Sequence, residues 1–141
     1  MIASQSLDSR IGAITSHIAR RLADAAVEDM RARYDFGRVL MTLRSGNRNP
    51  AGAGVLRLLA HQLEVDPSAL RRYAQVSEVI AAGEFDWLMG LSNRRGAPLT
   101  WSHIEILARV RSPEERRQLA AASARESLSV RGLSERLRAQ R

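Results

Sequence analysis

Apolar residues recur with helical spacing along the first third of the chain. They lie mostly three or four residues apart, at Leu7, Ile11, Ile14, Ile18 and Leu22 and again at Val27, Met30, Tyr34 and Met41. Such steps return side chains to one face of a helix, and charged residues occupy the opposite face. The pattern predicts one long helix within residues 1–44, or a helix pair with a joint near residues 23–27. We expect the apolar face to be buried in the protein's own core, with pairing to a second copy as the alternative.

Two stretches rich in glycine, asparagine and proline interrupt this pattern. Residues 45–54 (SGNRNPAGAG) and 90–98 (GLSNRRGAP) are predicted to be loops, because these residues break helices. Between them we expect helices over residues 54–63 and 67–81 and a short apolar piece at 85–89 (FDWLM). The first loop lacks the Lys-Ser/Thr pair of a phosphate-binding P-loop, so nucleotide binding is not expected there.

The last third of the chain, residues 99–141, contains three helix-start signals. Ser102 followed by Glu105 predicts a capping box, with Thr100 as the alternative cap. Ser112 precedes a proline and two glutamates, which suit the first turn of a helix. Ser129 follows Leu128 and precedes Leu133, which is the arrangement of a hydrophobic staple. No stretch shows the alternation of a β-strand. The sequence therefore predicts an all-α fold: one compact multi-helix domain over residues 1–141 that contains a helix-turn-helix within residues 54–81.

Composition and charge narrow the class of protein. Apolar residues make up 45% of the 141-residue chain, which is typical of a folded domain rather than a disordered tail. No apolar run is long enough to span a membrane, and the N-terminus lacks the features of a signal peptide. All 22 basic residues are arginine, and against 15 acidic residues they give a net charge of +7. We therefore expect a cytoplasmic, nucleoid-associated protein that is attracted to polyanions, nucleic acid first.

The segment LLAHQLEVDPSALRRYAQV (58–76) has the spacing of a helix-turn-helix corner. Asp66 is a good N-cap, and the following proline suits the first position of a helix. Small Ala60 permits close helix contact, and Val65 and Leu70 are expected to fill the corner from inside. Glu64 stands where such motifs often place glycine, and plain helical domains also contain helix pairs of this kind. The corner is thus predicted to be either a DNA-binding element or simple architecture.

The second helix of this corner carries side chains suited to reading DNA. Arginine can bind guanine through two hydrogen bonds, glutamine can read adenine, and serine can bind phosphate at a helix N-terminus. The candidate recognition residues are Ser68, Ala69, Arg71, Arg72 and Gln75. The candidate phosphate contacts are Arg57, Arg94, Arg95, Arg48 and His103.

Parts of the chain resemble two bacterial families. PSALRRYAQVSEVI (67–80), LTWSHIEIL (99–107), SPEER (112–116) and LSVRGLSERL (128–137) are similar to the helical DNA-binding region of the ParB/KorB partition and repressor family. Trp101-Ser102-His103, LSVRGL, RYDFGRVL (33–40) and GVLRLLAHQL (54–63) resemble the N-terminal domain of YhcG-type proteins, over nearly the whole chain. The resemblances imply a compact helical domain that binds DNA as a dimer, with Ser68, Arg71, Arg72 and Gln75 in the recognition helix.

The chain also departs from both families. Nothing matches the nucleotide-binding domain of ParB, with its arginine-rich phosphate box. The nuclease domain of YhcG-type proteins would follow this region, and its usual catalytic lysine has no counterpart in a chain without lysine. The activities of those additional domains are therefore not expected here.

No arrangement of residues indicates catalysis or a cofactor. The chain has no cysteine, and His17, His61 and His103 lack metal-ligand spacing, so neither an enzyme nor a metal site is expected. A partly buried, hydrogen-bonded histidine is the preferred interpretation of each of the three. Trp87 and Trp101 are expected to be core anchors.

Two functions therefore compete. The first is a double-stranded DNA-binding protein that uses a helix-turn-helix, as a small repressor, partition or nucleoid factor, and acts as a homodimer on a palindromic site. The second is a helical protein–protein interaction module whose arginines bind an acidic partner, without catalysis.

Overall fold

The structure is built from α-helices, and a longer loop over residues 90–100 separates the fourth helix from the fifth. The computed structural model describes residues 2–46 and 51–140. In chain order the helices are α1 (Ile2–Gly46), α2 (Ala51–Leu63), α3 (Pro67–Val79), α4 (Ala82–Met89), α5 (Trp101–Leu107), α6 (Pro113–Arg125) and α7 (Val130–Ala139). The described residues contain no β-strand, only an isolated bridge between Ser92 and Pro98. The predicted all-α fold is confirmed. In the described ranges no helix is long and apolar enough to cross a membrane.

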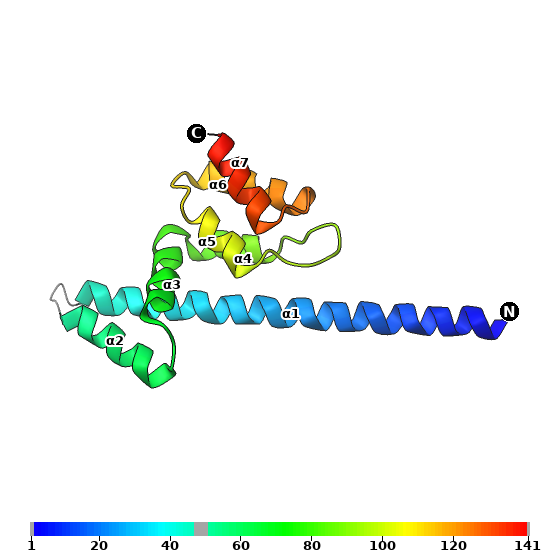
Figure 1. Ribbon diagram of the computed structural model, residues 1–141, viewed down its shortest axis with the longest axis horizontal. Coiled ribbons are helices and arrows are strands. Elements are labelled where there is room, and N and C mark those ends of the chain that lie inside the picture. Colours follow the sequence, from blue (N-terminus) through cyan, green and yellow to red (C-terminus); the bar gives the residue numbers. More distant parts are fainter. Residues whose placement is uncertain (1, 47–50, 141) are drawn as a thin grey trace.

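Helix α1 is the axis of the molecule. It runs unbroken through residues 23–27, so the long single helix is confirmed and the joint is not present. Figure 1 shows α2 on one side of the C-terminal part of α1 and the body formed by α4–α7 on the other, with α3 between them. The N-terminal part of α1 extends beyond all the other helices (Figure 1).

Helices α1 and α3 approach each other closely at Gly37. A Cβ atom at this position would collide with the carbonyl oxygen of Tyr73 and the hydroxyl of Ser77. Two hydrogen bonds secure the crossing: Ser77 Oγ donates to the Tyr34 carbonyl at 2.7 Å, and the Tyr34 hydroxyl donates to the Ile80 carbonyl at 2.6 Å. Glycine is needed here because no larger residue leaves room for the backbone of α3.

The main core joins α1 to the body. Its fully buried side chains include Ile80, Leu88, Ile104, Leu107 and Leu133, and Met30 and Tyr34 of α1 pack into the same cluster. A smaller cluster of Leu40, Ala60, Leu70 and Ala74 joins α1, α2 and α3. The corner at 58–76 is therefore packed directly onto the axis helix.

A buried ion pair fixes α6 to α4. The side chain of Arg116 is 2% exposed, and its Nε donates to Glu84 Oε2 at 2.6 Å. The same guanidinium donates to Glu84 Oε1 and to the carbonyls of Val110 and Val79. A buried charge requires such compensation, because unpaired it would carry a large desolvation cost.

Most predicted helix starts are confirmed, with two corrections. Ser112 and Ser129 are N-caps, as is Asp66. Thr100 rather than Ser102 caps α5, so the alternative holds there. The predicted loop at 45–54 is wrong at both ends, since α1 continues to Gly46 and α2 already begins at Ala51. Packing of α2 onto α1 outweighs the modest cost of glycine within a helix.

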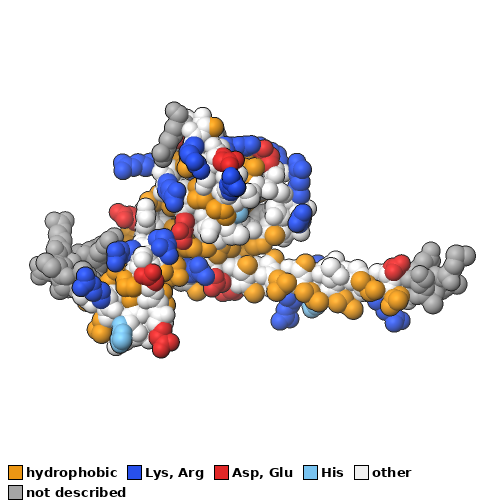
Figure 2. Space-filling view, in the orientation of Figure 1, with side chains coloured by type: hydrophobic (Ala, Val, Ile, Leu, Met, Phe, Trp, Pro, Cys, Tyr) orange, Lys and Arg blue, Asp and Glu red, His pale blue; other side chains and the backbone are white. Residues whose placement is uncertain are grey.

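The predicted burial of the whole apolar face of α1 is also wrong. Five large apolar side chains on its N-terminal half are 51% to 66% exposed: Leu7, Ile11, Ile14, Ile18 and Leu22. Figure 2 shows apolar side chains along this extended part of α1. The cause is geometric, because the other helices meet α1 only further along the chain.

Candidate nucleic-acid interface

The turn between α2 and α3 has a fixed backbone. Helix α2 ends at Leu63, and Glu64 adopts a positive φ of 55°. The N–H of Val65 then donates to the carbonyl of Ala60 at 2.9 Å, which closes the end of α2. Glutamate thus adopts the left-handed conformation for which glycine is better suited. Behind the turn, Ala60 and Leu70 are almost completely buried.

The N-terminus of α3 is capped by a carboxylate. Asp66 Oδ1 accepts hydrogen bonds from the Ser68 N–H at 3.0 Å and from the Ser68 hydroxyl at 2.8 Å. These bonds, with the nearby charges of Arg72 and Arg71, lower the pKa of Asp66 below its usual value. The hydroxyl proton of Ser68 is thereby engaged, and a negative charge occupies the helix end where a phosphate was expected.

One face of α3 is free for contact with a ligand. Arg71, Arg72 and Gln75 are exposed along it, and Glu78 follows one turn after Gln75. Ala69 is half-buried, and at 100° per residue it lies about 160° around the helix from Arg71. Figure 2 shows basic side chains over α2 and α3, with acidic ones among them. Three of the five candidate recognition residues therefore form one accessible row.

The exposed row adjoins α5. Arg72 Nε lies 3.6 Å from Glu105 Oε2, and both side chains are partly exposed. Arg72 and Gln75 line a small hollow of about 60 Å³ together with Glu105 and Arg109. Neither Arg109 nor Glu78 is among the candidates that the sequence suggested. No local signal would have placed Arg109 beside α3, because the contact depends on how α5 packs.

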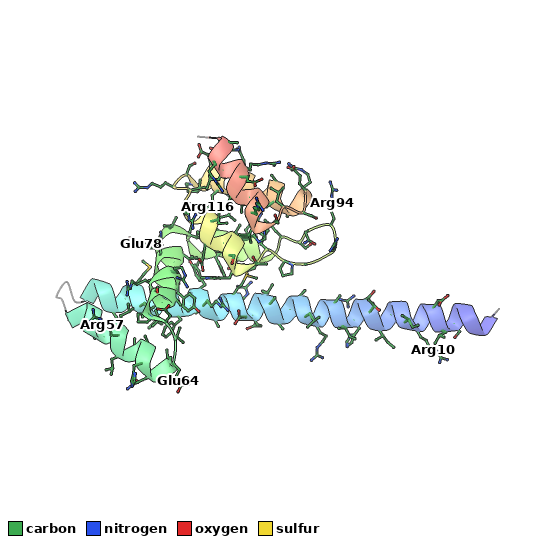
Figure 3. The ribbon with its side chains drawn as sticks, in the orientation of Figure 1. Arg10, Arg57, Glu64, Glu78, Arg94 and Arg116 are labelled. Carbon is green, nitrogen blue, oxygen red and sulfur yellow. The ribbon has the colours of Figure 1, made fainter. Side chains whose placement is uncertain are left out.

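The candidate phosphate contacts are divided between separate surfaces. Figure 3 shows Arg57 on α2 and Arg94 on the loop at the far side of the body. Arg94 is anchored there, because its Nε donates to the Arg125 carbonyl at 3.0 Å and its N–H to Ser127 Oγ at 3.1 Å. Arg95 lines an apolar groove beside α1. Arg48 lies outside the described residues.

His103 is not available for a phosphate contact. It is 7% exposed, and its Nδ1 accepts from the Thr100 N–H at 3.2 Å while its Nε2 lies 2.9 Å from the Leu128 carbonyl. The phosphate prediction for His103 is thus wrong, and the hydrogen-bonded alternative is confirmed. His17 and His61 are exposed, which contradicts the burial expected of them.

The two tryptophans also differ from each other. Trp101 is buried and packs edge-on against the ring of Tyr73 with 5.6 Å between centroids, as expected of a core anchor. Trp87 is 41% exposed, so the same expectation is wrong there. No group of three or more histidine, aspartate or glutamate side chains that could hold a metal ion occurs in the described part of the chain.

Comparison with known proteins gives no match: no family model, no curated protein and no solved structure is significantly similar to this chain. The resemblances to the ParB/KorB and YhcG-type families therefore rest on the quoted residues alone.

Proposed function

We propose that the protein binds double-stranded DNA through a helix-turn-helix formed by α2 and α3, with α3 as the recognition helix. One observation carries the proposal: α3 is buried along one side against α1 and exposes Arg71, Arg72 and Gln75 along the other. A recognition helix needs this division, because one side must be held rigidly while the other enters the major groove.

The exposed row has the chemistry of base readout. Arg71 can donate two hydrogen bonds to guanine, and Gln75 can pair with adenine through its amide. Glu78 extends the row by one turn and can accept a hydrogen bond from the amino group of cytosine. A row that offers both donors and an acceptor favours defined sequences over a general attraction to phosphate.

Phosphate contacts would come from arginines at the edge of the row. Arg72 and Arg109 border it on the side of α5, and Arg57 projects from α2, the helix before the turn. The net charge of +7 would steer the protein towards DNA. We assign it to the class of small repressors, partition factors or nucleoid factors, acting in the cytoplasm on the nucleoid, as a dimer and without catalysis.

The competing function is an interaction module that binds an acidic protein. It uses the same arginines but requires no ordered row of base-reading groups and predicts no preference among DNA sequences. Salt dependence alone does not separate the two functions, so the test has to include variants of the row.

The test is an anisotropy titration of a fluorescent duplex at 50 and 200 mM salt. A protein that makes about six to ten phosphate contacts loses roughly 10³- to 10⁵-fold in affinity across this range. Arg71→Ala/Arg72→Ala should weaken binding by about 10- to 100-fold and reduce the salt dependence. The matched control Arg131→Ala/Arg138→Ala removes two exposed charges from α7 and should bind within about threefold of the wild type. Equal losses in both double variants, or no wild-type binding at micromolar concentration, would refute the proposal.

A further inference from the structure

The N-terminal half of α1 carries an apolar surface that the other described helices leave open. We call Leu7, Ile11, Ile14, Ile18 and Leu22 the α1 stripe. Each of these side chains has at least half of its surface exposed, and steps of three or four residues place them on one face. The stripe is about 22 Å long at 1.5 Å per residue. An isolated helix in water is marginal without packing on its apolar face, so this surface requires a partner.

An apolar groove begins where the stripe ends. Its volume is about 620 Å³, and it lies between α1 and the loop that precedes α5. On α1 it is lined by the small residues Ala19, Ala23 and Ala26 together with Leu22, and Pro98 and Trp101 form part of the opposite wall. Leu22 thus belongs to both surfaces. The groove offers room for large apolar side chains. The side chains of the stripe are large and apolar, and no described helix covers them.

We propose that a second copy of the chain docks on this surface, with the two α1 helices antiparallel. Leu7 and Leu22 are equally distant from a point between Ile14 and Thr15, and so are Ile11 and Ile18. A two-fold axis at this pairing midpoint therefore places leucine against leucine and isoleucine against isoleucine. It also brings Leu7 of the second copy to Leu22, at the mouth of the groove. The same contact is made twice, as an isologous interface requires.

The parallel arrangement fits the fold less well. Phe36 and Leu40 follow Ile18 and Leu22 by 18 residues each, about five helical turns, so they lie on the same face of α1 as the stripe. That face is occupied there by α2, whose Leu59 and Ala60 pack with Phe36 and Leu40. A parallel pair in register would bring two copies of α2 to the same place. The antiparallel pair ends before α2 begins and uses the groove.

The stripe alone supplies more than half of the area that a standard dimer interface buries. A leucine or isoleucine side chain contributes on the order of 100 Å² of apolar surface, so the stripe supplies roughly 500 Å² per copy. A standard interface buries about 800 Å² on each partner. The lining of the groove and the flanks of the helix can supply the remainder.

The first test measures the mass of the protein without DNA, by light scattering coupled to size-exclusion chromatography. The wild type should be a dimer of 15.6 kDa chains at tens of micromolar. Ile11→Glu/Ile18→Glu should weaken dimerisation at least 100-fold and leave the core folded, with a cooperative urea transition, because both side chains lie outside the core. Leu58→Glu is the control, since Leu58 on α2 is 57% exposed and lies outside the proposed contact. A monomeric wild type, which would leave the stripe for a different protein, or a dimer that survives both stripe substitutions, would overturn the proposal.

The second test determines the direction of pairing. The chain contains no cysteine, so Glu28→Cys provides a single, exposed position for a spin label. Antiparallel pairing about the proposed midpoint separates the two labels by roughly 40 Å along the helices. A label–label distance below about 20 Å would show that the helices are parallel and would refute the antiparallel arrangement. Both tests are made without DNA, so their outcome does not depend on the proposed function.

Discussion

The close crossing of α1 and α3 predicts opposite effects for the same substitution at two glycines of one helix. Gly37→Ala adds a methyl group that collides with the backbone carbonyl of Tyr73 and the hydroxyl of Ser77. A backbone atom cannot turn away, so α3 must move. Gly12→Ala adds the same methyl group where no atom lies within 4 Å. Both substitutions raise the helix propensity of α1 by the same amount. A difference in stability between the two variants therefore reports the collision at the crossing.

The magnitude follows from three contributions. Overpacking of a filled site costs about 1–3 kcal/mol. Displacement of α3 weakens the Ser77–Tyr34 hydrogen bond, which contributes about 1 kcal/mol. Alanine in place of glycine within a helix returns about 0.5–1 kcal/mol. We therefore expect Gly37→Ala to lower the free energy of unfolding by about 2–3 kcal/mol and Gly12→Ala to raise it by up to about 1 kcal/mol.

Urea unfolding followed by circular dichroism measures both changes, provided that the slope of the transition is the same in each variant. A Gly37→Ala protein as stable as the wild type would show that α1 and α3 do not meet as closely as described. Equal destabilisation of both variants would show that the crossing is not the cause of the loss.

Four further predictions concern stability and DNA geometry. Arg116→Met should cost about 3–5 kcal/mol of unfolding free energy in urea, because it leaves Glu84 unpaired, and a loss below 1 kcal/mol would contradict this. Glu64→Gly should raise that free energy by about 0.5–1 kcal/mol by relieving the positive φ; a loss would speak against strain there. The pKa of Asp66 is lowered in the folded state, so its carboxylate stabilises the fold above roughly pH 4, and this contribution is lost as the pH falls through the folded-state pKa. Asp66→Asn should therefore be less stable than the wild type at neutral pH and approach wild-type stability in acid. A difference in unfolding free energy that stays constant with pH would exclude this cause. Since α3 crosses α1 at Gly37, antiparallel pairing separates the two α3 helices by about 67 Å, so half-sites in selected DNA should lie about 20 base pairs apart and not about 10.

The elements that the sequence predicts correctly depend on local chemistry. Asp66, Ser112 and Ser129 act as N-caps because each side chain satisfies a backbone N–H two or three residues later, within its own turn. The corner after Leu63 follows from the same local logic, and its glutamate adopts the conformation that the spacing demands. Neighbouring residues alone determine these features.

The features that could not be predicted depend on packing between distant segments. The step of five residues from Leu22 to Val27 rotates the apolar face of α1 by about 140°. This rotation was the signal in the sequence that the N-terminal stripe and the core-facing residues of α1 lie on different faces and do not pack against the same surface. Thr100 caps α5 in preference to Ser102 because His103 completes the capping box from inside the core. The separation of Arg57 from Arg94 likewise depends on where the body lies relative to α2.

The central claim is that the exposed face of α3 reads the bases of DNA. Selection of preferred duplexes from a random pool, with the wild type, Arg71→Ala and the control Arg131→Ala, tests it most directly. We predict that the wild type and the control enrich the same sequence and that Arg71→Ala loses the preference at one base pair of each half-site, since a bidentate arginine contributes about 1–3 kcal/mol of discrimination at one position. Identical enriched sequences for Arg71→Ala and the wild type, or no enrichment by the wild type, would contradict the claim.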